Sequence, residues 1–279
     1  AARKSDIVIL CMGINQNLEG EEMTVKSKGF AGGDRTEIDL PDTQKELVAA
    51  ICDLKKPVVL VLQNGSPLSI PVEHQKVNAV VEGWYGGQSA GTGLADILLG
   101  DYNPSGRLPV TVYKSLEQLL GFEDYGMQGR TYRYFSGDPL YEFGYGLSYT
   151  SFRYTNLQIP TRIATNDPIE FSVDVTNTGN MDGDEVVQVY ISHESLPFVT
   201  PIRSLKGFKR VSLKKGETKT IRFLLESDDL SVVKDDGRVI VMPCTIKMSV
   251  GGKQPDMQSL KQGTVVEKNV DLVGEPVNL

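Results

Sequence analysis

Apolar residues in the first third of the chain form short continuous runs at 6–13, 57–65 and 77–87. Runs of this length, rich in Val, Ile and Leu, are typical of strands in a parallel sheet that is covered on both faces. The third run ends in a glycine turn at Gly86 and Gly87. We therefore expect three strands of a mainly parallel sheet.

Helical periodicity separates these runs. The segment 41–56 predicts a helix with Pro41 in its first turn, and 91–100 predicts a second, short helix that ends at Gly100. The first helix carries one apolar stripe, made of Leu47, Val48, Ile51 and Leu54. Strands that alternate with helices predict a doubly wound α/β sandwich, whose sites lie in loops beyond the carboxyl ends of the strands.

From residue 168 the apolar pattern changes to a period of two. The segment "IEFSVDVTN" places Phe171, Val173 and Val175 on one face. The segments "EVVQVYIS", "KTIRFLL" and "CTIKMSV" behave in the same way, and polar turns separate them. We expect an antiparallel, fibronectin type III-like β-sandwich without the Cys…Trp…Cys core of antibody domains. The predicted fold class is thus α/β plus all-β.

These patterns predict four regions: an α/β sandwich domain at 1–120, a connection at 121–152, the β-sandwich at 153–252 and a tail at 253–279. The connection holds ten of the chain's twenty Tyr and Phe residues, and we expect most of them to pack between the two domains. The tail is polar, and we expect it to wrap a surface.

Composition excludes several partners. The formal net charge is -7 and the pI is near 5.0, so nucleic acid and membrane surfaces are poor partners. No GxGxxG or GxxxxGK motif is present, so no cofactor is expected. No CxxC or CxxH spacing favours a metal site. Cys11 and Cys52 lie in apolar surroundings and are expected to be buried thiols.

The chain begins without Met and enters its first apolar run within a few residues. We expect it to be a processed or excised piece whose signal region lies elsewhere, with a periplasmic or extracellular location favoured and a cytoplasmic one possible in principle. An oligomer is compatible with the sequence.

The stretch "LEGEEM" brings Glu19, Glu21 and Glu22 together beside Leu18 and Met23. Crowded like charges and partial burial raise the pKa of a carboxyl group and suit it to general acid catalysis. The alternative is a solvated acidic turn. The only two histidines fall in different predicted domains, without a GxSxG motif, which disfavours a hydrolytic triad.

Further along, Asp34 and Arg35 follow a glycine-rich run and could cap the next helix or form an ion pair. Trp84 ends a strand at a glycine turn, where its ring could stack on a sugar or pack in the core.

Several segments together resemble glycoside hydrolase family 3, the β-glucosidases and β-xylosidases. They are "DRTEIDLPDTQKELV", "GDYNPSGRLPVTVY" and "YRYFSGDPLYEFGYGLSYTSF"; "VDVTNTGNMDGDEVVQVYIS" and "RSLKGFKRVSLKKGET" resemble that family's fibronectin type III-like domain. The resemblance covers residues 1 to about 252. It implies a retaining, exo-acting glycosidase that acts on an oligosaccharide or β-glycoside. It also implies an N-terminal (β/α)8-barrel domain of the same protein, which carries the nucleophilic aspartate and is absent from this chain.

The resemblance implies that a loop of the α/β sandwich supplies the acid/base glutamate. Matching "EGE" places that role on Glu21, with Glu22 next and Glu19 third. Family members that carry the glutamate two residues before Asp-Arg would place it at Gly32, which cannot act. Trp84, Asp34 and Arg35 are the expected substrate-binding residues. Ser89 stands where the family usually has glutamate.

Two other functions stay open at this point. The chain could be a non-catalytic carbohydrate-binding or scaffold module, which sugar affinity without the barrel would support. A doubly wound nucleotide-binding protein would need a phosphate-binding loop, and the sequence has none.

Overall fold

The structure is a computed structural model that describes residues 1–19, 23–32 and 34–279. It contains two compact units, each with its own core. Unit 1 comprises residues 1–101, 112–124 and 137–141, and unit 2 comprises residues 102–111, 125–136 and 142–279. Among the described residues, no helix is both long enough and apolar enough to span a membrane.

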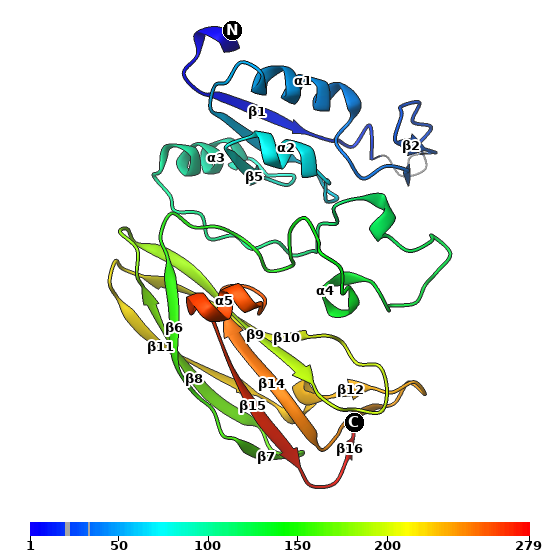
Figure 1. The fold of residues 1–279 in the computed structure, drawn as a ribbon, viewed down its shortest axis with the longest axis vertical. Helices are drawn as coiled ribbons and strands as arrows, with labels where there is room; N and C mark the ends of the chain where they lie inside the picture. The colour runs from blue at the N-terminus through cyan, green and yellow to red at the C-terminus, as the bar shows by residue number, and fades with distance from the viewer. Residues whose placement is uncertain (20–22, 33) are drawn as a thin grey trace. The chain divides into compact units, whose positions relative to one another are not determined.

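Unit 1 is built on a three-stranded parallel sheet with the order β1-β4-β5 (Figure 1). The strands are β1 (Val8–Gly13), β4 (Val58–Gln63) and β5 (Ala79–Glu82), and the helices are α1 (Asp42–Cys52), α2 (Pro71–Lys76) and α3 (Ala90–Leu99). Two short 3-10 turns, η1 (Ala2–Lys4) and η2 (Leu116–Gln118), and the hairpin β2 (Phe30–Ala31) with β3 (Asp34–Arg35) complete it.

The predicted strands and helices of unit 1 are confirmed, with different limits. α1 ends at Cys52, four residues before the expected end, and Lys55 has a left-handed φ of 56°. Val48 is buried on the expected stripe, whereas Leu47 is 45% exposed. α3 ends as predicted, with Gly100 in the left-handed conformation. The helix α2 was not predicted.

The expectation that β1 is covered on both faces is wrong for the described residues. Leu10 is buried in the core beside α1, but Ile9, on the opposite face, is 51% exposed. Cys11 lies on the same open face and is exposed, and Cys52 is only partly buried. The two thiols are therefore not the fully buried groups that their apolar neighbours predicted: Cys11 points to the open face of β1, and Cys52 ends helix α1.

Unit 2 is a β-sandwich. Its larger sheet has the order β10-β9-β14-β15-β7, and a second sheet has the order β11-β8-β6. These strands are β6 (Phe152–Gln158), β7 (Arg162–Ala164), β8 (Ile169–Asn177), β9 (Gly183–His193), β10 (Ser204–Leu213), β11 (Thr218–Leu225), β14 (Cys244–Gly251) and β15 (Val265–Val273). A small sheet of β12 (Val232–Val233), β13 (Val239–Val241) and β16 (Val277–Asn278), the 3-10 turn η3 (Ser227–Leu230) and the helices α4 (Thr131–Tyr134) and α5 (Met257–Gln262) complete the unit.

The period-two pattern predicted the core of this sandwich correctly. Phe171, Val173 and Val175 of β8 are all buried, and the residues between them are more exposed. The rings of Phe171 and Phe223 face each other across the β8–β11 pair and stack with centroids 5.3 Å apart. Such cross-strand aromatic pairs stabilise antiparallel sheets.

The expectation that the segment after Gly252 wraps a surface is wrong. β15 pairs with β14 from Val265 to Leu272 and lies inside the larger sheet (Figure 1). Its residues Val265, Val270 and Leu272 are buried. The alternation in "VVEKNVDLV" carries this signal, although charged residues on the other face make the segment polar on average.

Candidate functional site

The three parallel strands of unit 1 end at one edge of their sheet, and each continues into a polar loop. β1 ends at Gly13, β4 at Gln63 and β5 at Glu82. Ligands of open α/β sheets bind beyond the carboxyl ends of the strands. This edge is therefore the candidate functional site, and every residue described in the next paragraphs belongs to unit 1.

Glu19 reaches this edge through a turn that follows β1. The backbone carbonyl of Asn15 accepts hydrogen bonds from the amides of Leu18 and Glu19, both at 2.9 Å. The Glu19 carboxylate then accepts hydrogen bonds from the hydroxyls of Ser66 and Tyr85, with 2.7 Å between the Tyr85 oxygen and Oε2. One carboxylate thus joins the loops that follow β1, β4 and β5.

These contacts keep Glu19 ionised. Partial burial by itself would raise its pKa, but hydrogen bonds from Ser66, Tyr85 and the Gly65 backbone amide, with the charge of Arg35, hold the pKa below its ordinary value. Burial and the neighbouring carboxylate raise the pKa of Tyr85 to about 12. Glu19 is therefore an acceptor at neutral pH and a poor proton donor.

Arg35 approaches the same edge from the β2–β3 hairpin. Its Nη1 donates to the Ser66 hydroxyl at 2.8 Å and to the Pro67 carbonyl at 2.9 Å, and its Nε donates to the Glu37 carbonyl at 3.2 Å. Its Nη2 is buried and has no hydrogen-bond partner among the described residues. The guanidinium is thus held by the protein, with one donor left unused.

The other two expected substrate-binding residues lie in different surroundings. Asp34 pairs with Ala31 in the hairpin through its backbone, and its side chain is exposed. Trp84 is partly buried and has a left-handed φ of 49°, which is uncommon for a bulky aromatic residue and often marks a functional position. Sugar binding by either residue stays a prediction.

Glu82 is a carboxyl group that sequence reasoning missed. It ends β5, and its Oε1 accepts a hydrogen bond from the Trp84 amide at 3.2 Å. Asn64, which is fully buried, donates weakly to its Oε2 at 3.4 Å. Burial raises the pKa of Glu82 to about 7, although these two hydrogen bonds oppose the shift. A carboxyl group with such a pKa holds a proton for part of the time at neutral pH.

The structure brings Glu19, Arg35, Ser66, Tyr85 and Glu82 to one edge of the sheet. The expected catalytic residues Glu21 and Glu22 lie outside the described residues, so their roles stay predictions. The signal for the missed residues was available, since "QNGS" and "EGWY" lie in the carboxyl-terminal parts of the predicted strands 57–65 and 77–87, with Ser66 one residue beyond the first. Polar residues at the carboxyl ends of parallel strands are candidates by position alone.

No cluster of three His, Cys, Asp or Glu side chains in the described part of the chain could hold a metal ion. The oxygen atoms of the candidate site are instead bound to hydroxyl, amide and guanidinium donors. These described groups can donate and accept hydrogen bonds, and Glu82 can exchange a proton near neutral pH.

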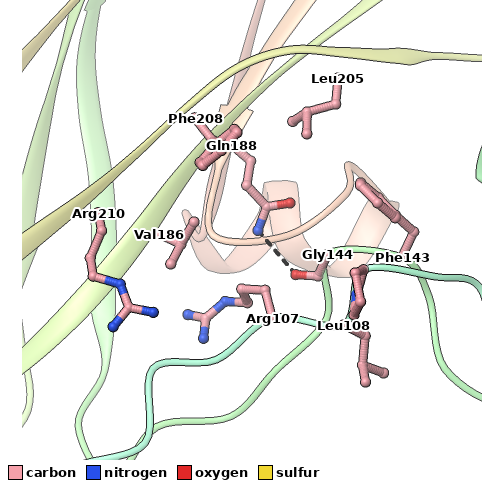
Figure 2. Close-up of a pocket in the computed structure, with 10 residues that line it drawn as sticks. Arg107, Leu108, Phe143, Gly144, Val186, Gln188, Leu205, Phe208 and Arg210 are labelled. Atoms are coloured by element: carbon pink, nitrogen blue, oxygen red, sulfur yellow. Dashed lines mark hydrogen bonds between the residues drawn. The ribbon is translucent and has the colours of Figure 1, made fainter. Parts of the chain in front are cut away.

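A separate hollow of about 310 Å³ lies wholly in unit 2 (Figure 2). Apolar side chains, among them Leu108, Phe143 and Phe208, form most of its lining. Figure 2 shows the hydrogen bond that Gln188 donates to the carbonyl of Gly144. Its length is 3.0 Å, and both residues line the hollow. The hollow has no carboxylate in its lining and is a poor candidate for acid or base chemistry.

Comparison with known proteins adds a family match to this geometry. Residues 1–149 match the glycosyl hydrolase family 3 C-terminal domain, and residues 185–254 match a fibronectin type III-like domain. The two matches together cover most of both units.

Relatives of known name point the same way. The chain is 46% identical over 224 residues to a xylan 1,4-beta-xylosidase of Xylanibacter ruminicola, covering 80% of this chain and 26% of that protein. It is 34% identical over 277 residues to a periplasmic beta-glucosidase of Salmonella typhimurium, covering 95% of this chain and 34% of that protein. The chain therefore spans only about a quarter to a third of the length of these relatives.

A solved structure shows the same fold. A β-glucosidase of Erythrobacter marinus superposes with a TM-score of 0.83 and 35% identity, over 98% of this chain and 35% of that one. A β-glucosidase of Listeria innocua, solved in complex with glucose, superposes with a TM-score of 0.80 and 27% identity, over 98% of this chain and 37% of that one.

Proposed function

This chain belongs to glycosyl hydrolase family 3, and from that premise we propose that it is the C-terminal part of a retaining, exo-acting β-glycosidase. The substrates are terminal, non-reducing β-D-glucosyl or β-D-xylosyl residues of an oligosaccharide or β-glycoside. The chain contributes the general acid/base glutamate. The observation that carries this proposal is the family match over residues 1–149, which includes the glutamate stretch and the whole candidate edge.

The candidate edge supports a particular choice of acid. Glu19 is bound by two hydroxyls, and its pKa lies below the ordinary value, so it is a poor donor. Glu21 and Glu22 are then the remaining glutamates of the stretch, and the motif favours Glu21. We propose Glu21 as the acid/base, with Glu22 as the second choice.

The mechanism follows from retaining chemistry. Glu21 donates its proton to the glycosidic oxygen while an aspartate attacks the anomeric carbon, and the bond to the leaving group breaks. Ionised Glu21 then takes a proton from water, which attacks the same carbon. The bond between that carbon and the aspartate breaks, and the sugar leaves with its original configuration. The two carboxyl groups must lie roughly 5–5.5 Å apart. Trp84 would stack on the sugar, and Asp34 would bind one of its hydroxyls.

The aspartate belongs to the N-terminal (β/α)8-barrel domain that we propose as the partner of this chain within one polypeptide. This division fits the chain's share of its relatives, about a quarter to a third of their length. The name of the periplasmic relative supports a periplasmic or extracellular location. An oligomer is compatible with the proposal and is not required by it.

Hydrolysis of p-nitrophenyl β-glucoside and β-xyloside tests the function, with the chain alone and with the protein that also carries the preceding segment. We expect turnover only for the longer protein, because the chain holds one carboxyl group of the required pair. Turnover by the chain alone would contradict the division of the catalytic pair.

The variant Glu21→Ala in the longer protein tests the acid. General acid catalysis contributes about 10²–10⁴-fold, so kcat should fall by this factor on glycosides with poor leaving groups and less on activated ones. Azide should restore turnover by replacing the base-activated water. Full activity in this variant would move the role to Glu22, and Glu22→Ala is the matched comparison.

A non-catalytic carbohydrate-binding module is the second candidate. Partly buried Trp84 at the candidate edge could bind a sugar ring. It favours the binding-module function if the chain alone binds sugar. Titration of the chain with xylobiose and cellobiose, followed by Trp84 fluorescence, would reveal such binding. Measurable affinity together with no turnover in the longer protein would favour this function over catalysis.

A further inference from the structure

The stretch of residues 19–35, here called the glutamate segment, has both of its ends, Glu19 and Arg35, at the candidate edge. The segment begins at Glu19, directly after the turn that follows β1, and ends at Arg35 in β3. Both of these residues bind the hydroxyl of Ser66, in the loop after β4. Two residues that are sixteen positions apart thus meet on one oxygen atom.

The hydrogen bonds at Ser66 form a chain with one direction. Arg35 Nη1 donates to the Ser66 oxygen at 2.8 Å, and the Ser66 hydroxyl donates its single proton to Glu19 Oε1. A hydroxyl can donate one hydrogen bond and accept others, so Ser66 can serve both partners at once. The opposite charges at its two ends polarise both hydrogen bonds and strengthen them.

The backbone around Ser66 is shaped to admit these partners. A Cβ atom at Gly65 would lie 2.7 Å from the Tyr85 ring and 3.3 Å from Glu19 Oε2. Glycine at this position therefore allows the Tyr85 ring to approach while its hydroxyl binds the second oxygen of Glu19. The φ angle of Gly65 is not in the left-handed region, so the close approach is the reason for glycine here.

We propose that Glu19, Ser66 and Arg35 form a clasp that closes both ends of the glutamate segment onto one hydroxyl. In this proposal, which rests on the proposed function, Glu19 is a positioning residue for the acid/base glutamate and not the acid itself. The clasp ties the start of the segment to its end, and this closure reduces the conformational freedom of the described residues 23–32.

Hydrogen exchange of the full chain tests the clasp directly. In Ser66→Ala, the Arg35 and Glu19 side chains lose their shared partner, and exchange of the amides in residues 23–32 should become about fivefold to tenfold faster. Ser69→Ala is the matched control: it removes a buried hydroxyl in the same loop, which donates to the Lys114 carbonyl and not to a described residue of the segment. Exchange in 23–32 should not change in the control.

The pair Gly65→Ala and Gly87→Ala tests the approach of Tyr85. A Cβ atom at Gly87 meets no atom within 4 Å, whereas the one at Gly65 must displace the Tyr85 ring. Only Gly65→Ala should accelerate exchange in 23–32. If neither Ser66→Ala nor Gly65→Ala changes that exchange relative to its control, the clasp does not exist.

Kinetics of the longer protein test the positioning role. Glu19→Gln should lower kcat for substrates with poor leaving groups by about tenfold. The pH profile of kcat/KM should still decrease at alkaline pH, where the general acid loses its proton. Loss of this alkaline decrease in Glu19→Gln would make Glu19 the proton donor and overturn the proposal. Unchanged kcat in Glu19→Gln would overturn it as well. If the wild-type protein hydrolyses no glycoside, the proposed function fails, and hydrogen exchange still decides whether the clasp exists.

Discussion

Each unit holds one arginine at the centre of a hydrogen-bond network, and the two networks differ in how fully their groups are paired. In unit 2, Arg107 donates from all three nitrogens, to Glu185 at 3.1 Å and to the carbonyls of Ser105, Gly106 and Gly252. The side chains of Arg107 and Glu185 are only 10% and 3% exposed. In unit 1, Arg35 has a buried Nη2 without a partner in the described part of the chain.

The carboxyl groups beside the two arginines differ in the same way. Glu185 is buried, and it binds both Arg107 and the Tyr154 hydroxyl, at 3.1 Å. Glu19 is more open to solvent, and Glu82 near it exchanges a proton near neutral pH. A closed network is suited to hold two segments together. An open one, with an unused donor and a titrating acid, is suited to bind a ligand or transfer a proton.

The largest effect is expected in the closed network. Arg107→Ala leaves the Glu185 carboxylate buried without a counter-charge, and the free energy of unfolding should fall by about 3–5 kcal/mol. Urea unfolding, monitored by circular dichroism, measures the decrease in the free energy of unfolding. Faster hydrogen exchange in β9 would show that this destabilisation lies in the β-sandwich.

The double variant Arg107→Met with Glu185→Leu is the control for this prediction. Replacement of both charges by apolar side chains is often neutral or stabilising, so most of the lost stability should return. A loss below about 1 kcal/mol in Arg107→Ala would mean that water enters the site and that the network is not closed.

A smaller and pH-dependent effect is expected at Glu82. Its pKa is about 7 in the folded protein and about 4.5 in the unfolded chain, so the folded state binds the proton more tightly. Stability from this group is therefore full below pH 4.5, falls as the pH rises toward 7 and then levels off. Glu82→Gln should remove this slope and raise the stability of unit 1 at pH 8 by roughly 1–2 kcal/mol, after allowance for partial solvation.

Fluorescence of Trp84 measures this change, because it is the chain's one tryptophan and lies in unit 1. Unfolding curves of the wild-type chain and of Glu82→Gln should coincide at pH 4 and separate at pH 8. Equal slopes in the two proteins between pH 4.5 and 7 would show that Glu82 is solvated and has an ordinary pKa.

The smallest effect is expected at Glu19, with the opposite sign. Its pKa is lowered in the folded protein, so its contribution to stability is present above the unfolded value of 4.5 and disappears as the pH falls through the folded value. Glu19→Gln should cost roughly 0.5 kcal/mol at pH 7 and nothing near pH 2, because the group is only partly buried and solvent screens its charge. A cost that persists at pH 2 would point to packing and not to charge.

The sequence predicted the elements better than their surroundings. Period-two alternation placed Phe171, Val173 and Val175 in the core of the sandwich, because alternate residues of a strand must point to one face. The continuous apolar run at 6–13 correctly predicted the strand β1. It incorrectly predicted that both faces are buried, since Ile9 and Cys11 lie on an open face. Burial depends on what packs against a strand, and the run itself carries no such information.

The site was only partly predictable for a similar reason. The stretch around Glu19 and the position of Arg35 were recognisable as local motifs. Ser66 and Glu82 belong to no such motif, and only their position at the carboxyl end of a predicted strand marks them as candidates. Their importance arises from the parallel register of β1, β4 and β5, which brings loops from distant parts of the chain to one edge.

The amino-acid sequence by itself determined the α/β pattern, the sandwich pattern and the family, since periodicity and motifs are properties of neighbouring residues. Tertiary structure alone decided which polar groups share a hydroxyl and which carboxyl group has its pKa raised. Both outcomes depend on distance and burial between residues far apart in the chain. The pairing of strands sets these distances and this burial. As a result, Glu19 accepts a hydrogen bond from Ser66, and the pKa of Glu82 rises to about 7.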